Sequence, residues 1–272
     1  MLGIGGIGMS ALARYFKESG TEVAGYDRNS SSLTDRLKDL GVECHFIDDP
    51  EWIPDNFKKR NTLVIYTPAI PSTNREFVHL KENGYTLVKR SQVLGELAAD
   101  KDLIAIGGTH GKTSTSAISA HMLTEGKKKC HAFVGGVMVN YETNFLSGGR
   151  SKLMVAEADE YDRSFLTLHP EIAVVTSTEA DHLDIYQDQR SLVRAFNQFV
   201  QQIKPDGTLI YKHGIDLKLP DHVEALSYGF EKAADLCARK IRVEEGAFVY
   251  DVKGVVNIEG IRQPFPGRHN IE

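Results

Sequence analysis

One stretch near the middle of the chain decides the fold: Leu103-Ile104-Ala105-Ile106-Gly107-Gly108-Thr109-His110-Gly111-Lys112-Thr113-Ser114. An apolar run, a glycine-rich turn and a helix-forming segment follow one another here, which predicts a strand, a loop and a helix. Glycines let successive backbone amides turn inward around a phosphate, and the N-terminus of the following helix adds partial positive charge. The order of these elements predicts a phosphate-binding loop.

We expect this loop to bind ATP through Gly108, Thr109, His110, Gly111, Lys112, Thr113 and Ser114. Lys112 is the candidate catalytic cation, reaching the β- and γ-phosphates, and the Thr113 hydroxyl is a candidate Mg²⁺ ligand. The general pattern requires glycine five positions before Gly111, where this sequence has Ile106, so the strict pattern fails. The alternative is a glycine turn that only caps a helix, but Gly-Lys-Thr at a strand–helix junction favours phosphate binding.

A second glycine-rich stretch, Gly3-Ile4-Gly5-Gly6-Ile7-Gly8, precedes a predicted helix over residues 9–19. Asp27 follows at the end of a predicted strand, about where dinucleotide-binding folds place an acidic residue that accepts from a ribose or base. The pattern indicates a diphosphate on the loop and a nucleoside toward Asp27. A tight strand–helix turn is the alternative, and this half taken alone would suggest NAD.

Acidic residues follow two further predicted strands. Glu157 opens Glu157-Ala158-Asp159-Glu160-Tyr161-Asp162, and His182 lies within Glu179-Ala180-Asp181-His182-Leu183-Asp184. Carboxylates at strand ends opposite a phosphate loop are suited to Mg²⁺, and a histidine can bind a metal while a carboxylate orients its ring. Glu157 and His182 are therefore predicted metal ligands, and His182 is also a candidate catalytic residue. The other carboxylates stay open between substrate contacts and solvated charges.

Strand-like and helical segments alternate along the chain, which predicts an α/β fold. The pattern restarts after the polar residues 100–102, so we expect a Rossmann-like N-terminal domain over residues 1–99. A P-loop-type ATPase central domain with a mainly parallel sheet is expected over residues 100–272. Both ends look cut, because only two residues precede Gly3 and no closing element follows the last predicted strand.

The composition is that of a globular protein with an ordinary core: 41% hydrophobic and 25% charged residues in 272. A formal net charge of -5 argues against nucleic acid as the main ligand. The three cysteines are scattered without metal-ligand spacing, which indicates a reducing compartment. No membrane-spanning run or signal peptide is recognisable, so we expect a cytoplasmic protein without a membrane partner.

In combination these motifs resemble the Mur ligase family, whose ATP loop G-T-x-G-K-T/S-T/S is matched by Gly108 to Ser114. The resemblance also accounts for the missing earlier glycine. It extends over essentially the whole chain and is greatest to the branch that adds L-alanine. The stretches that carry it are residues 3–10, the His110 position, Glu157 to Glu160, Glu179 to His182, and Pro266 to Asn270.

The resemblance implies a three-domain ligase with UDP-N-acetylmuramate and L-alanine as its small-molecule substrates and ATP with Mg²⁺ as its cofactors. The first domain would hold the UDP-sugar through Gly5, Gly6, Gly8, Met9, Ser10 and Asp27, with the glycines at the diphosphate and Asp27 near the uridine. Asn270 would contact adenine. The third domain, which brings the amino acid, is absent from this sequence, so we expect the fragment alone not to ligate.

The sequence departs from the family pattern at two places. Ser177 stands where the family often has asparagine, and no lysine lies before Lys204 where several relatives use a carbamylated one. We therefore predict no carbamylated lysine, and the ligands of a second metal stay open. Three other functions remain: a ligase that adds a preformed tripeptide, an NAD-dependent oxidoreductase, and a non-catalytic UDP-sugar binding module.

Overall fold

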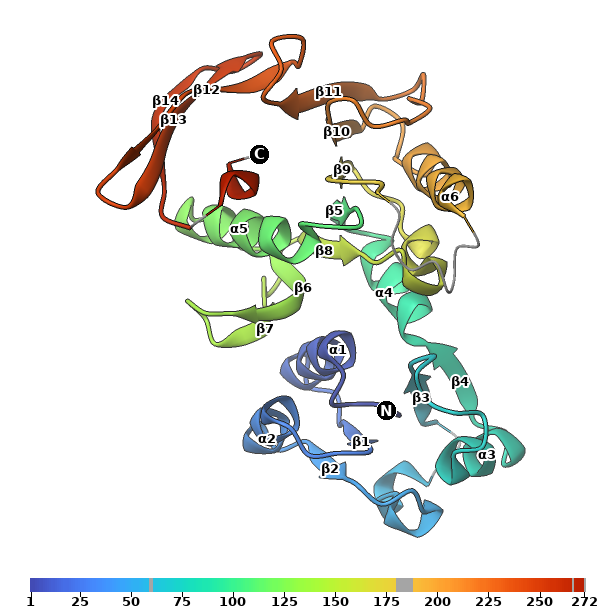
Figure 1. Ribbon diagram of the computed structural model, residues 1–272. Coiled ribbons are helices and arrows are strands. Elements are labelled where there is room, and N and C mark those ends of the chain that lie inside the picture. Colours follow the sequence, from blue (N-terminus) through green and yellow to red (C-terminus); the bar gives the residue numbers. More distant parts are fainter. Residues whose placement is uncertain (59–60, 180–187, 266, 272) are drawn as a thin grey trace.

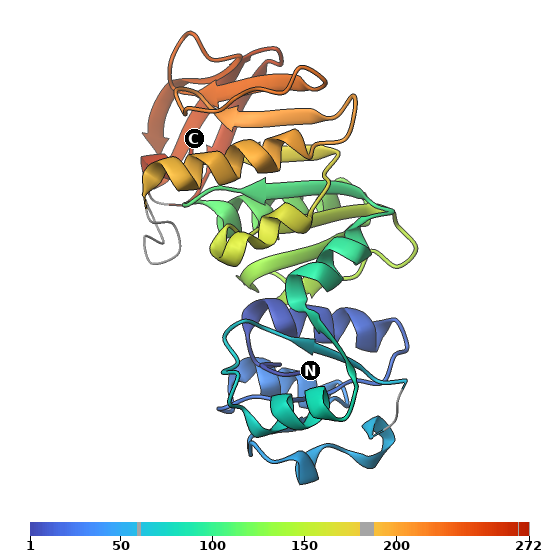
Figure 2. The ribbon, with the colours of Figure 1, turned by 90° about the vertical axis from the view of Figure 1, so that its right-hand side faces the viewer.

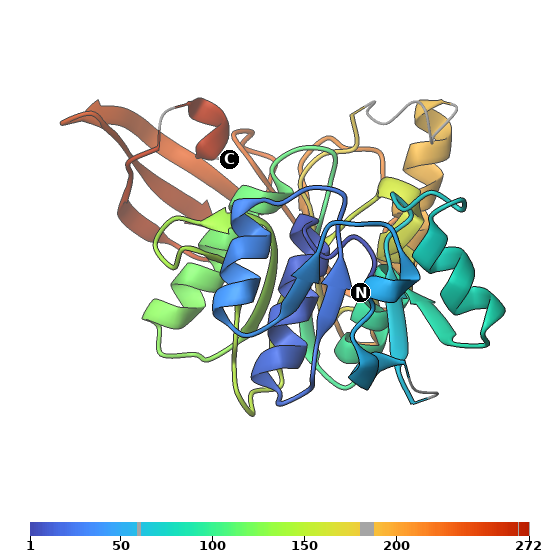
Figure 3. The ribbon, with the colours of Figure 1, turned by 90° about the horizontal axis from the view of Figure 1, so that it is seen from below.

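The computed structural model describes residues 1–58, 61–179, 188–265 and 267–271 (Figure 1). Two β-sheets with their helices lie one above the other, the N-terminal half at one end and the C-terminal strands at the other (Figure 2). Seen from below, the first sheet lies in front of the second, and the C-terminal hairpin projects to one side (Figure 3). The expected α/β fold is confirmed. Among the described residues, no helix is both long and apolar enough to cross a bilayer.

The first sheet is parallel and small. β1 pairs with β2 and β3 pairs with β4, while Leu2 bridges Tyr26 of β1 and Tyr66 of β3, which gives the Rossmann-like order around the N-terminus. Helices connect successive strands, as parallel pairing requires. The elements are α1 (Ile7–Glu18), β1 (Ala24–Tyr26), α2 (Ser32–Asp39), β2 (Glu43–His45), η1 (Pro50–Trp52), η2 (Asp55–Phe57), β3 (Leu63–Tyr66), α3 (Arg75–Glu82), β4 (Thr86–Lys89) and α4 (Arg90–Ala98).

The second sheet has ten strands in the order β14-β13-β12-β11-β10-β9-β5-β8-β6-β7. Its strands from β12 to β6 pair in parallel, and β7, β13 and β14 add antiparallel edges. The elements are β5 (Asp102–Gly107), α5 (Lys112–Glu125), β6 (His131–Met138), β7 (Thr143–Leu146), β8 (Leu153–Ala158), η3 (Tyr161–Thr167), β9 (Ile172–Val175), α6 (Gln189–Gln201), β10 (Thr208–Lys212), β11 (Glu224–Gly229), β12 (Leu236–Glu244), β13 (Ala247–Gly254), β14 (Ile258–Gln263) and η4 (Arg268–Asn270).

The centre of the second sheet is buried on both faces. Leu103, Ala105 and Ile106 of β5 have no exposed surface, as expected for a central parallel strand whose two sides are covered. On one side Phe165 of η3 stacks on Phe199 of α6 with ring centroids 5.1 Å apart and meets Phe196 edge-on at 5.3 Å. These aromatic contacts fix η3 and α6 to each other.

The first helix of the chain also packs against the second sheet. Asn144 of β7 donates through its side-chain amide to the Ile7 carbonyl at 2.6 Å and to the Ser10 hydroxyl at 2.9 Å. Tyr15 meets the rings of His131 and Phe145 edge-on, at 5.6 and 5.9 Å. The N-terminus of α1 is thereby held in a fixed position relative to the second half.

Helix α1 begins earlier than the sequence predicted. We expected a glycine loop through Gly8 and a helix from Met9, but the helix begins at Ile7, with Gly6 as its N-cap residue. The reason is that the turn is completed by Gly3 to Gly6, whose last amide donates back to the Gly3 carbonyl at 3.1 Å. Gly8 therefore lies in the first turn of the helix.

His131 should make the stability of the fold pH-dependent. The residue is 5% exposed, its ring accepts from the Gly148 amide at 3.3 Å, and burial holds its pKa below the ordinary value. The unfolded histidine takes up a proton near its ordinary pKa of about 6.5, whereas the folded one resists it, so acidification favours the unfolded chain.

We expect the free energy of unfolding to fall as the pH drops below about 6.5, with a slope of at most about 1.4 kcal/mol per pH unit from this group. Denaturant titrations between pH 7.5 and 5.5 measure the slope, which His131→Gln should reduce. His79→Gln is the control because His79 of α3 is only half-buried, whereas His131 is buried. Equal slopes in the His131 variant and the unmodified chain would contradict the prediction.

Candidate functional site

The central loop has the backbone that its glycines predicted. It runs from the end of β5 to Lys112, the first residue of α5, and Gly108 and Gly111 have φ angles of +135° and +86°. Residues with a side chain rarely adopt these angles. A Cβ on Gly108 would also lie 2.1 Å from the Thr176 hydroxyl oxygen. The loop can therefore pass this close to Thr176 only if residue 108 is glycine.

Two residues after β9 anchor the loop. Thr109 donates from its amide to the Ser177 carbonyl and from its hydroxyl to the Ser177 hydroxyl, both at 3.0 Å. Thr176 donates from its amide to the Gly107 carbonyl at 3.0 Å, and its hydroxyl contacts the carbonyls of Gly107 and His110. The sequence did not indicate this role of Thr176 and Ser177. The available signal was that they follow a strand expected to lie parallel to β5.

The loop presents unused donors. Within the described part of the chain, the backbone amides of residues 110–114 donate no hydrogen bond. Four of these residues, His110, Gly111, Thr113 and Ser114, are exposed. The first amides of a helix lack intrahelical acceptors and carry the positive end of its dipole. The loop is therefore open, with its donors available to an anion.

Lys112 is held above the loop by a buried carboxylate. Its ammonium donates to the Gly108 carbonyl at 2.6 Å and to Glu160 Oε1 at 2.8 Å. The Glu160 side chain has no exposed surface, whereas 15% of the Lys112 side chain is exposed. The sequence left the role of Glu160 open, and the structure gives it a partner in the loop lysine.

Glu157 lies beside the loop near the end of β8. Its Oε2 accepts from the Thr113 hydroxyl at 3.3 Å and its Oε1 accepts from the Gly135 amide at 2.6 Å. Burial raises the pKa of this carboxyl above its ordinary value. A Cβ on Gly135 would lie 2.4 Å from Oε2, so the glycine makes room for the carboxylate. The Thr113 hydroxyl oxygen and Glu157 Oε2 therefore lie 3.3 Å apart beside the loop, and both are oxygen ligands of the type that Mg²⁺ binds.

The backbone amides of the N-terminal loop donate hydrogen bonds to acceptors within the first half of the chain. Gly3 and Ile4 donate to the Tyr26 carbonyl at 2.8 and 3.0 Å, and Gly5 donates to Asp27 Oδ2 at 2.8 Å. Within the described residues, the next amides, those of residues 7–9, donate no hydrogen bond. The first turn of α1, rather than the loop before it, therefore offers donors, and Asp27 holds the loop in place.

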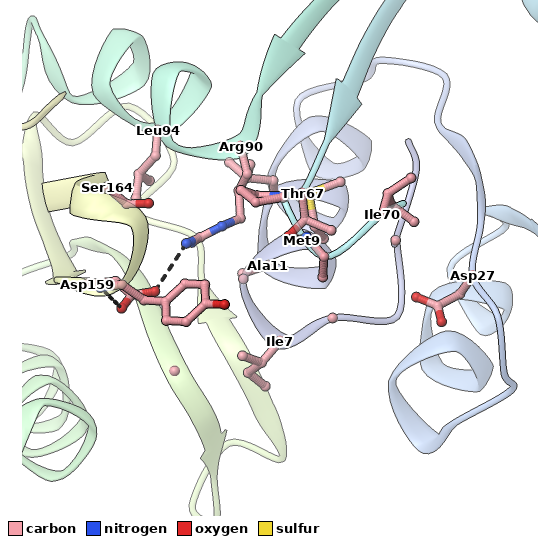
Figure 4. Close-up of a pocket in the computed structure, with 18 of the residues that line it drawn as sticks. Ile7, Met9, Ala11, Asp27, Thr67, Ile70, Arg90, Leu94, Asp159 and Ser164 are labelled. Carbon is pink, nitrogen blue, oxygen red and sulfur yellow. Dashed lines mark hydrogen bonds and ion pairs between the residues drawn. The ribbon is translucent and has the colours of Figure 1, made fainter. Parts of the chain in front are cut away.

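A cavity of about 620 Å³ lies between the two halves (Figure 4). It is lined by residues from both: the predicted nucleotide-sugar residues Gly6, Gly8, Met9 and Asp27 face it together with Glu157, whereas none of the central-loop residues 108–114 lines it. The first half contributes Gly6, Gly8, Met9, Asp27, Thr67 and Arg90, and the second contributes Gly135, Glu157, Asp159 and Tyr161.

Other predicted site residues lie elsewhere. Ser10 is fully buried, and its hydroxyl accepts from Asn144 at 2.9 Å. Asn270 ends η4, and its carbonyl accepts from the Gln263 side chain at 3.1 Å. His182 lies outside the described residues. Among those that are described, no group of three or more His, Cys, Asp or Glu side chains is placed to hold a metal.

The fold and the loops define a class: α/β proteins that join a Rossmann-like unit to a strand–loop–helix unit of the phosphate-binding type. Sequence comparison narrows this class. Residues 1–102 match the Mur ligase family, catalytic domain, and residues 106–272 match the Mur ligase middle domain. The chain belongs to the Mur ligase family, as its motifs predicted.

Relatives of known name cover the whole chain. It is 44% identical to the UDP-N-acetylmuramate–L-alanine ligase of Cytophaga hutchinsonii, an alignment that covers 100% of this chain and 59% of that protein. The enzyme of the same name from Phocaeicola vulgatus is also 44% identical, with 100% and 60% covered. The chain thus spans about 59% of the length of such relatives.

Solved structures share the fold. The UDP-N-acetylmuramate-alanine ligase of Thermotoga maritima superposes with a TM-score of 0.85 at 25% identity, covering 99% of this chain and 61% of that one. The UDP-N-acetylmuramate:L-alanyl-gamma-D-glutamyl-meso-diaminopimelate ligase of Neisseria meningitides gives 0.86 at 22% identity, covering 99% and 88%. At 22% identity, the match to the Neisseria protein shows only that the fold is shared.

Thr176→Val should destabilise the loop. Valine keeps the shape of threonine but removes the hydroxyl that contacts the Gly107 and His110 carbonyls. We expect the free energy of unfolding to fall by about 1 kcal/mol. Denaturant titration measures the change, and Thr176→Ser, which keeps the hydroxyl, is the control. A valine variant as stable as the unmodified chain would show that the hydroxyl does not anchor the loop.

Proposed function

We propose that this chain forms the nucleotide-sugar and ATP sites of a ligase that joins L-alanine to the lactyl carboxylate of UDP-N-acetylmuramate. The activity belongs to the full-length protein, since the chain spans about 59% of its named relatives. The observation that carries the proposal is the inter-domain cavity with open helix amides on one side and the Glu157 carboxylate beside the central loop on the other. The 44% identity to enzymes of that name supports the same reaction.

The chemistry requires an activated carboxylate. Phosphoryl transfer from ATP to the lactyl carboxylate gives an acyl phosphate and ADP; the L-alanine amine then attacks the acyl carbon, phosphate leaves and the amine loses a proton. The first step brings two anions together, so positive charge has to be arranged between them in advance. We assign no general base to the second step.

The central loop would hold ATP. The open amides of residues 110–114 would bind the phosphates, and Lys112, which lies 2.8 Å from Glu160, would reach the β- and γ-phosphates. Gly108 and Thr109 shape the loop. Thr113 and Glu157 would hold Mg²⁺, which when bound neutralises phosphate charge. His182 remains a proposed ligand of a second ion and a proposed catalytic residue, and Asn270 a proposed adenine contact.

The first half would hold the UDP-sugar. Its diphosphate would bind the amides of the first turn of α1, which places Gly8 and Met9 nearer to it than Gly5, whose amide donates to Asp27. Gly6 and Asp27 line the same cavity, with Asp27 on the uridine side. The buried Ser10 would act indirectly, by holding α1 in position through its hydrogen bond with Asn144. We also propose a division between two domains near residue 100 and a cytoplasmic location.

A ligase that adds a preformed tripeptide is the nearest alternative. The fold does not separate the two, because TM-scores are 0.86 to the tripeptide ligase and 0.85 to the alanine ligase. The choice of L-alanine rests on the sequence identity of the named relatives. A substrate assay of the full-length enzyme with L-alanine and with the tripeptide discriminates between them.

Calorimetry on the 272-residue chain tests the two proposed sites separately. We expect UDP-N-acetylmuramate and MgATP each to bind, because each loop-and-helix unit presents its own donors. NAD is the comparison ligand for the oxidoreductase alternative. Binding of NAD without binding of either expected ligand would overturn the proposal.

Lys112→Ala should weaken binding at the proposed ATP site and leave the proposed nucleotide-sugar site unchanged. We expect MgATP affinity to fall by about tenfold or more, because a charge-assisted contact to phosphate is lost. Binding of UDP-N-acetylmuramate should be unchanged, and ligation by the full-length enzyme should be abolished. Lys128→Ala, at an exposed lysine after α5, is the control. Undiminished turnover in the Lys112 variant would refute the phosphate-loop assignment.

A further inference from the structure

Arg90 extends from one half of the protein toward the other. It is the first residue of α4, directly after β4, and its side chain lines the inter-domain cavity (Figure 4). Its guanidinium pairs with the carboxylate of Asp159 in the second half, with 3.3 Å between NH2 and Oδ2. The Arg90 side chain is 21% exposed and that of Asp159 38%, so a ligand in the cavity can reach both.

The same guanidinium lies against the start of α1. A Cβ added to Gly8 would lie 2.6 Å from Arg90 NH1, so this nitrogen is in contact range of the helix backbone. The Gly8 amide is one of those in the first turn that, among the described residues, donate no hydrogen bond. A guanidinium cation and open amides thus meet at one part of the cavity. A planar guanidinium fork matches phosphate oxygens better than a single ammonium does.

We infer that Arg90 binds the diphosphate of the nucleotide sugar at the start of α1 and leaves Asp159 when it does so, which couples this site to the ATP site. The inference rests on the proposed function and adds a binding residue and a route of communication to it. Asp159 and the ligand phosphate compete for one cation, because both are anions within reach of the same guanidinium.

The position of Asp159 explains how the movement of Arg90 from Asp159 to the ligand phosphate would affect the ATP site. It lies between Glu157, which contacts Thr113, and Glu160, which holds Lys112 at 2.8 Å. The Tyr161 amide donates to Asp159 Oδ1 at 3.0 Å, so the carboxylate keeps its position when Arg90 turns away. The uncompensated charge then lies on the cavity wall shared with Glu157, where it attracts a cation. Nucleotide sugar and magnesium nucleotide should therefore each tighten the binding of the other.

Calorimetry with UDP as the probe tests the binding part on the 272-residue chain. We expect Arg90→Ala to raise the Kd for UDP by about tenfold or more, because a charge-assisted contact is lost. Asp159→Asn should lower it several-fold, because the competing anion is gone. Arg75→Ala is the matched control: Arg75 pairs with Asp49 at 2.9 Å and does not line the cavity. It should leave the Kd unchanged.

The coupling part is measured as the Kd for MgADP with and without saturating UDP. In the unmodified chain UDP should tighten MgADP binding by roughly fivefold or more, and this effect should vanish in both Arg90→Ala and Asp159→Asn. An ion pair that only holds the halves together predicts instead that both variants weaken UDP binding alike and unfold at a lower temperature.

That result would overturn the inference, as would UDP binding that is unchanged in Arg90→Ala. If the unmodified chain does not bind UDP at all, the proposed function fails and this inference fails with it. The two failures are therefore distinguishable.

Discussion

The arrangement of the candidate site depends on the parallel pairing of β5 with β8 and β9. Parallel strands end at the same edge of a sheet, so the loop after β5, the carboxylates at the end of β8 and just after it, and the polar residues after β9 must converge. Register makes this specific: Gly107 lies opposite Ala158 on one side and Val175 on the other. Thr176 can therefore bond the loop backbone, and Glu157 and Glu160 can reach Thr113 and Lys112.

The sequence predicted those parts of the fold that follow from local pattern. The strand expected from the apolar run Leu103–Ile106 and the helix expected after the glycine turn are confirmed as β5 and α5, because apolar runs and glycine turns are local signals. The short strand β2 and the strands β6, β7, β11 and β14 were not predicted. β2 and β7 have three and four residues and are defined mainly by the neighbour with which they pair. Strand preference of this kind depends on context rather than composition.

The sequence predicted which residues gather at the central loop better than it predicted the contacts that they make. The sequence indicated Lys112, Thr113 and Glu157 through their motifs, and these side chains do gather at one edge of the sheet. The sequence could not show that Glu160 pairs with Lys112. Four acidic residues lie close together there, and the path of η3 decides which of them points toward the lysine. Nor could it show that Gly5 donates to Asp27, or that Ser10 is buried against Asn144, since both depend on contacts between segments distant in sequence.

The packing of α1 against β6 and β7 has a consequence for how the protein can be divided. Met9 and Leu12 of α1 belong to the same buried apolar cluster as Phe133 and Phe145 of the second sheet. Removing residues 1–99 would uncover these rings and leave β7 as an uncovered sheet edge, a combination that promotes association between molecules. The two halves bind different ligands in our proposal, yet they share one core, so each is a poor candidate for expression or crystallisation by itself.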